Sequence, residues 1–134
     1  MAMAKIVTPE VAVSKIEDGT HVVFPGSCTN PARFYDSFTK NIARFSDLTI
    51  YSGLSLGDYP FLKKGLGTNF HYKTWQAAPQ LRKLFQENDK AKVSFIPARL
   101  SDLDALVSDQ GAIQPDVAVI QTSIPQNDGT VSLG

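Results

Sequence analysis

Two patterns of apolar residues alternate along this 134-residue chain and predict strands and helices in turn. Compact runs rich in β-branched and aromatic residues are typical of strands, and they lie at residues 20–24, 47–51, 69–75, 92–96 and 117–120. Segments whose apolar residues recur every three or four positions are typical of helices, and they lie at residues 8–18, 31–44, 79–88 and 101–111. This alternation predicts an α/β fold, a predominantly parallel open sheet with helices on both faces.

The helix expected at 31–44 carries the most regular apolar stripe. Phe34, Phe38, Ile42 and Phe45 lie four, four and three positions apart, so they share one face of the helix. We predict that this stripe packs against the sheet as core and does not line a cofactor site. Asn30 stands where it can cap the start of this helix.

Capping residues mark two other helix starts, and glycines mark a loop. Thr8 is the expected N-cap of the first helix, with Pro9 in its first turn, and Ser101 is the expected N-cap of the last one. Several glycines and Pro60 between residues 53 and 67 predict one long loop, a kind of segment that is often functional or flexible.

The end of the chain organises the expected sheet. The unbroken apolar run at 117–120 predicts a central strand that is buried on both faces. The sequence Asn127-Asp128-Gly129 then predicts a turn, and residues 130–133 predict a second strand. Because this strand would stop at the last residue with its ladder unfinished, we expect a continuation of the sheet beyond it or a covered edge.

Composition narrows the class of protein. Hydrophobic residues at 43% and charged residues at 19% are typical of a globular domain, and 13 basic residues balance 13 acidic ones, which argues against a nucleic-acid partner. No apolar stretch reaches the roughly 18 residues that span a bilayer, and no secretory signal is visible, so we expect no membrane partner and a cytoplasmic location. The single cysteine and the isolated His21 and His71 do not form a metal-ligand pattern.

Candidate chemistry lies in two loops that follow buried strands, because ligands of open α/β sheets collect outside the carboxyl ends of the strands. The candidate binding residues are Gly26, Ser27, Cys28, Thr29 and Asn30 in the first loop and Ser123, Pro125 and Asp128 in the second. The first loop precedes a helix start, where free N–H groups suit an anion, and its glycine lets the backbone approach a ligand. A small polar loop with a capping residue is, however, also an ordinary way to begin a helix.

Nucleophilic catalysis has weak candidates in these loops. No histidine stands where it would complete a triad with Ser123 and Asp128, so we favour a turn at Asp128 and a backbone hydrogen bond from Ser123. Cys28 near a helix start could have a lowered thiol pKa, although a small buried apolar role is the favoured interpretation.

Several landmarks in the same order resemble the acetyl-CoA hydrolase/transferase family, which includes the 4-hydroxybutyrate, butyrate and acetate CoA-transferases. They are Gly26 to Pro31, Ile96-Pro97, Leu100-Ser101-Asp102, Asp116-Val117-Ala118, Ser123, Pro125, Asp128-Gly129 and Ser132-Leu133-Gly134. The resemblance runs from about residue 16 onward and covers only the front portion of a two-domain enzyme. It implies that residues 1–134 are a single α/β domain, the N-terminal and incomplete part of a CoA-transferase-like protein.

The resemblance also implies a reaction, in which coenzyme A passes between an acyl-CoA and a small carboxylate, or an acetyl-CoA hydrolysis. Coenzyme A and acyl-CoA would be substrates, no covalently bound cofactor is expected, and the glycine-containing loop would lie beside the coenzyme or acyl pocket. Such enzymes are expected to use a glutamate that becomes a glutamyl-CoA thioester. Glu10, Glu17 and Glu87 are the glutamates of this chain, and all three are expected on solvated helix surfaces.

No catalytic residue is therefore assigned within the chain. The glutamate is expected in a second domain or a partner chain, and a homo- or hetero-oligomer is expected with it. The alternative from another class is a non-catalytic α/β binding or assembly module that pairs with another chain. A third possibility is an enzyme that depends on Cys28.

Overall fold

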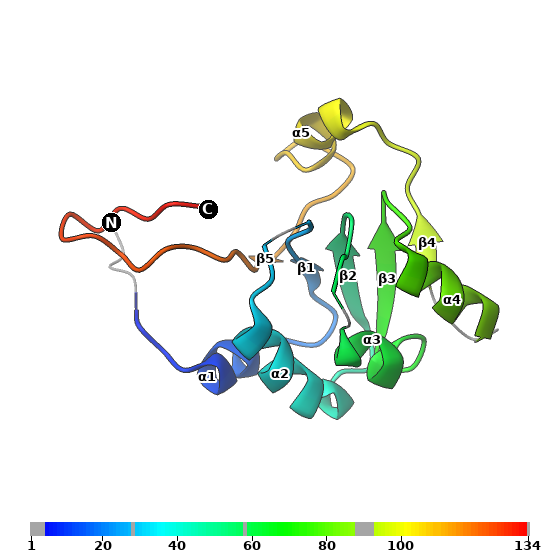
Figure 1. Cartoon of the computed structure of the whole chain (residues 1–134), viewed down its shortest axis with the longest axis horizontal. Helices are drawn as coiled ribbons and strands as arrows, with labels where there is room; N and C mark the ends of the chain where they lie inside the picture. The colour runs from blue at the N-terminus through cyan, green and yellow to red at the C-terminus, as the bar shows by residue number, and fades with distance from the viewer. Residues whose placement is uncertain (1–4, 28, 58, 88–92, 134) are drawn as a thin grey trace.

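The structure, a computed structural model, describes residues 5–27, 29–57, 59–87 and 93–133 (Figure 1). Its centre is a five-stranded sheet in the order β4-β3-β2-β1-β5, and every pair of neighbouring strands is parallel. The strands are β1 (His21–Val23), β2 (Leu48–Ser52), β3 (Phe70–Thr74), β4 (Val93–Phe95) and β5 (Val117–Ala118). The predicted α/β fold with a parallel open sheet is confirmed.

The helices are short and connect these strands. They are α1 (Pro9–Ser14), α2 (Ala32–Lys40), η1 (Ile42–Arg44), α3 (Pro60–Gly65), α4 (Pro79–Glu87), η2 (Leu100–Asp102) and α5 (Leu103–Leu106). α2 lies between α1 and α3 and packs against both, as Figure 1 shows. The connection between β4 and β5 carries η2 and α5 and crosses from one edge of the sheet to the other.

The predicted stripe of α2 and η1 is core. Phe38, Ile42 and Phe45 are buried, and Phe34 is partly buried against the same cluster. The ring of Phe24, at the end of β1, lies 5.4 Å from that of Phe38 in an edge-to-face arrangement, which favours the contact beyond the area that it buries. Through its aromatic stripe, α2 therefore packs against the chain at the carboxyl end of β1.

Two of the three predicted caps differ from the structure. Thr8 caps α1 as expected, since its hydroxyl accepts a hydrogen bond from the Val11 N–H at 3.3 Å. α2 has Pro31 at its N-cap and no side-chain cap, so the Asn30 cap is wrong. The N-cap of η2 is Arg99, two residues before the predicted Ser101, and the Arg99 N–H donates to the Asp102 carboxylate at 3.1 Å.

The long loop predicted at 53–67 is wrong, because it contains α3. Pro60 occupies the first turn, where its missing N–H costs nothing, and the buried Phe61 and Leu62 anchor the helix in the core. A six-residue helix has too few apolar positions to show a period, so the glycines around it dominated the sequence pattern.

The central position predicted for residues 117–120 is also wrong. β5 has only two residues and lies at an edge of the sheet, paired with β1 alone. Val117 and Val119 pack against the core, whereas Ala118 is exposed and Ile120 is 58% exposed. Burial alternates along these residues, as it does in a strand with one buried face. The sequence pattern did not show this alternation, because the residues on the exposed face are apolar too.

Candidate functional site at the carboxyl ends of the strands

A hollow of about 230 Å³ lies where β1, β2 and β3 end. We call it the carboxyl-edge pocket, and it is lined by Gly26, Ser27, Gly53, Leu54, Trp75, Gln76, Leu100 and Leu103. Three of its walls are the loops that leave neighbouring parallel strands, and the fourth is the segment of η2 and α5. This is the location at which open α/β sheets bind ligands.

The first wall is a tight turn after β1. The Ser27 N–H donates to the Leu54 carbonyl at 2.6 Å, so the loops that follow β1 and β2 stay paired beyond the strands. A Cβ on Gly26 would lie 3.3 Å from the Leu54 backbone nitrogen, which explains why a glycine allows this approach. Ser27 has φ of 57°, a left-handed conformation that is uncommon for serine and that is often found at functional sites.

The second wall is the indole of Trp75, directly after β3. A Cβ on Gly53 would lie 2.7 Å from its Nε1, so the ring rests against a position that only glycine leaves open. Gln76 fixes the same corner, because its Oε1 accepts the Leu54 N–H at 3.1 Å. The hydroxyl of Thr74 donates to the Gln76 carbonyl at 2.8 Å and accepts the Gln76 N–H at 3.1 Å, which closes the turn around Trp75.

The remaining residues of the first predicted loop support the turn. The Thr29 hydroxyl donates to the Gly26 carbonyl at 2.7 Å. The amide of Asn30 lies next to Gly57, which brings the loop after β1 against the loop after β2. Cys28 lies outside the described residues.

The second predicted loop belongs to an exposed segment, residues 120–133, which we call the C-terminal arm. Its own hydrogen bonds fold it into a hairpin: the Ser123 N–H donates to the Ser132 carbonyl, and the Gln126 N–H donates to the Thr130 carbonyl, each at 2.9 Å. Figure 1 shows the arm, in orange and red, leading from β5 away from the sheet. The structure therefore places Gly26 and Ser27 in the pocket and Ser123, Pro125 and Asp128 on the arm.

The polar side chains of the arm hold its turn, as the favoured interpretation of the sequence expected. The Asp128 carboxylate accepts the Thr130 N–H at 3.0 Å and the Thr130 hydroxyl at 2.7 Å, and these bonds lower the pKa of Asp128. The Ser123 hydroxyl accepts the Ser132 N–H at 2.9 Å. The predicted turn at residues 127–129 is confirmed, with Gly129 at φ of 83°. The second strand predicted at residues 130–133 is wrong, because these exposed residues pair within the arm and belong to no strand of the sheet that the structure describes.

Sequence reasoning missed Gly53, Leu54, Trp75 and Gln76 as pocket residues. A signal existed, because Gly53 and Leu54 follow the strand predicted at 47–51 after one residue, and Trp75 and Gln76 lie at the end of the strand predicted at 69–75. The ends of β2 and β3 lie beside the Gly26 loop because of the order of the strands, which could not be predicted from the sequence pattern.

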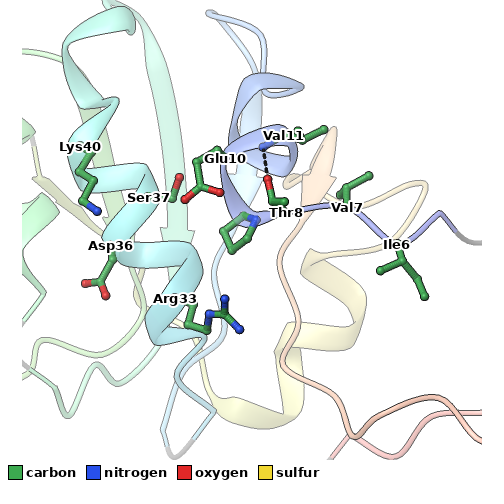
Figure 2. Close-up of a pocket in the computed structure, with 10 residues that line it drawn as sticks. Ile6, Val7, Thr8, Glu10, Val11, Arg33, Asp36, Ser37 and Lys40 are labelled. Atoms are coloured by element: carbon green, nitrogen blue, oxygen red, sulfur yellow. Dashed lines mark hydrogen bonds between the residues drawn. The ribbon is translucent and has the colours of Figure 1, made fainter.

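A second and larger hollow, of about 770 Å³, lies between the start of α1 and the outer side of α2. Figure 2 shows Glu10 on α1 beside Ser37 on α2, with Arg33 and Lys40 on the same helix. A hydrogen bond from its own backbone N–H, then the Thr8 hydroxyl and these two cations, lower the pKa of Glu10. The carboxylate is exposed and therefore charged and hydrated, which makes it a poor nucleophile toward a thioester.

The other two glutamates are exposed as well. Glu17 lies after α1, and Glu87 ends α4, where it pairs with Lys83 at 3.7 Å. The expectation that all three glutamates are solvated is confirmed. In the part of the chain that the structure describes, no three histidine, cysteine or acidic residues gather as a metal site would require, and no helix is long and apolar enough to cross a membrane.

Known proteins match almost the whole chain. A profile of the acetyl-CoA hydrolase/transferase N-terminal domain matches residues 3–134. A 4-hydroxybutyrate coenzyme A transferase from Clostridium kluyveri is 27% identical over 130 residues, which are 97% of this chain and 29% of that protein. The chain thus spans less than a third of the length of this relative.

Solved structures share the fold. The 4-hydroxybutyrate CoA-transferase from Porphyromonas gingivalis aligns with a TM-score of 0.65 and 25% identity, over 96% of this chain and 27% of that one. RipA from Yersinia pestis aligns with a TM-score of 0.77 and 19% identity, over 96% of this chain and 31% of that one, a likeness of fold alone.

Proposed function

This chain belongs to the acetyl-CoA hydrolase/transferase family, and we propose that it supplies one wall of an active site that transfers coenzyme A between an acyl-CoA and a small carboxylate. In this proposal residues 1–134 act as one N-terminal α/β domain. The observation that carries the proposal is the carboxyl-edge pocket, where the Gly26 loop meets the ends of three parallel strands. The strained Ser27 within it supports a functional role.

The attacking carboxylate is proposed to come from outside these 134 residues. The reaction begins when a glutamate oxygen bonds to the thioester carbonyl carbon and the C–S bond breaks, which releases the coenzyme A thiolate. That thiolate then attacks the glutamyl carbonyl of the resulting anhydride, which frees the carboxylate product and leaves glutamyl-CoA. A carboxylate performs this step well when it is partly desolvated and oxyanion donors face the carbonyl, and Glu10, Glu17 and Glu87 are all exposed.

Binding is the first test, and the chain provides its own probe. Trp75 is the single tryptophan and lines the pocket, so its fluorescence reports on this site alone. We expect a saturable change in emission when coenzyme A or acetyl-CoA is added. Gly26→Val, which forces the loop away from Leu54, should weaken this binding at least tenfold, whereas Glu10→Gln, in the hollow beside α1, should leave it unchanged. No saturable change up to millimolar ligand, or an equal loss in both variants, would overturn the pocket assignment.

Turnover is the second test. We expect the purified 134-residue chain to transfer no coenzyme A from acetyl-CoA to 4-hydroxybutyrate or butyrate. Robust transfer by this chain alone would show that the nucleophile lies within it. The variants Glu10→Gln, Glu17→Gln and Glu87→Gln would then identify which glutamate acts.

A further inference from the structure

We propose that Trp75, seated on Gly53, is the wall that limits the length of the acyl group that this site accepts. The inference rests on the proposed function and adds the determinant of substrate length. Both polar and apolar side chains line the carboxyl-edge pocket.

The apolar side chains of the pocket come from three separate segments. Leu54 follows β2, Trp75 follows β3, and Leu100 and Leu103 come from the connection across the sheet. Leu100 is 75% exposed, although it lines a hollow that other apolar side chains share. An aliphatic chain that enters the pocket would cover these side chains, and each methylene that it buries should tighten binding about fourfold.

The indole is partly buried and packs against Gly53. Its Nε1 edge lies against Gly53, where an added Cβ would approach within 2.7 Å of Nε1 and 3.2 Å of Cε2. Its neighbours Thr74 and Gln76 are hydrogen-bonded to each other, and Gln76 Oε1 accepts the Leu54 N–H. In this proposal the ring forms the end of the pocket, which an acyl chain of increasing length must meet.

Substitutions at Gly53 and at Trp75 should change the position of this wall in opposite directions. Replacement of Gly53 by alanine leaves no room for the present ring position, so the ring must move off this residue. In this proposal the ring moves into the hollow that both residues line. Replacement of Trp75 by alanine removes the wall. The two variants should therefore shift the preferred acyl length in opposite directions, which a general loss of structure would not do.

The experiment measures affinity for acetyl-, propionyl-, butyryl-, hexanoyl- and octanoyl-CoA by isothermal titration calorimetry. In the wild-type chain we expect each added methylene to tighten binding up to a limiting length and then to weaken it. Trp75→Ala should move this limit to longer acyl groups by two carbons or more, and Gly53→Ala should move it to shorter ones. Arg33→Ala, on the surface of α2, should keep the wild-type profile.

Several outcomes separate this inference from the proposed function. Failure of the wild-type chain to bind any of these thioesters would overturn the proposed function itself. Binding with a length profile that is the same in wild type, Trp75→Ala and Gly53→Ala would overturn the role of Trp75 alone. If Trp75→Ala does not fold, as judged by circular dichroism, Trp75→Leu provides the second variant, with a longer limit again expected and an unchanged limit counting against the proposal.

Discussion

The side chain of Asp18 joins the turn after α1 to the start of β2. Its carboxylate accepts the Ser46 N–H at 3.0 Å, the Asp47 N–H at 2.9 Å and a hydrogen bond from the Ser46 hydroxyl. These bonds favour the charged form, and they lower the pKa of Asp18 from 3.8 to about 2, with the Ser46 hydroxyl as the largest cause and the two backbone donors next. The carboxylate therefore stabilises the fold only while it is charged.

We predict an acid-dependent loss of stability that depends on Asp18. Because the pKa is lower in the folded state, the stabilisation is complete above about pH 4 and is lost as the pH falls toward about 2. Asp18→Asn should reduce the free energy of unfolding at pH 7 and flatten its slope between pH 4 and pH 2. Urea denaturation at a series of pH values measures both quantities.

The matched variant for this prediction is Ser46→Ala. It removes the hydroxyl donor and keeps the backbone donors, so its slope between pH 4 and pH 2 should lie between those of wild type and Asp18→Asn. If the free energy of unfolding of Asp18→Asn falls between pH 4 and pH 2 as steeply as that of the wild type, this carboxylate does not link folding to pH.

At the scale of elements, α3 shows how a single position can hold a helix that the sequence pattern hides. Gly65, its last residue, is buried between η1 and β3, where an added Cβ would approach Ile42 Cγ1 to 2.5 Å and Phe70 Cε1 to 2.8 Å. Neither side chain can withdraw easily, because both are in the core. The glycine is thus required by packing and not by a turn.

We predict that Gly65→Ala lowers the free energy of unfolding by about 1–3 kcal/mol, the usual cost of an overpacked core site. Thr68→Ala, an exposed change three residues later, should stay within about 0.5 kcal/mol of wild type. Urea denaturation at neutral pH measures both values. Equal stability of Gly65→Ala and wild type would mean that α3 can move away from η1 without cost.

The same elements show what the sequence could predict. The five strands and most helices were found because each buries a regular apolar pattern, as β3 does with Phe70, Tyr72 and Thr74. Strand order was not predictable from periodicity, so residues 117–120 were placed at the centre of the sheet and not at its edge. For the site, the loop at Gly26 followed from topology, whereas the contact of Trp75 with Gly53 depends on two neighbouring strand ends that only the folded chain brings together.

At the scale of the whole molecule, the C-terminal arm differs from the rest of the chain. The sheet and its helices bury one continuous core, yet the arm packs little of its own apolar surface. Ile120, Ile124, Val131 and Leu133 are all exposed, and the exposed fraction of Ile124 is 88%. The arm continues from β5, whose outer edge pairs with no strand among the described residues. Exposed apolar residues beside an open strand edge are a recognised site of protein association.

We predict that the isolated chain associates through this arm, because association removes both the apolar side chains and the strand edge from water. Sedimentation velocity should show an average sedimentation coefficient that rises with protein concentration. The double variant Ile124→Ser with Leu133→Ser should reduce this rise, whereas Val11→Ser, an exposed apolar residue on α1, should not. A wild-type chain that sediments as a single monomeric species at high concentration would contradict the prediction, since the arm would then be stable in water without a partner.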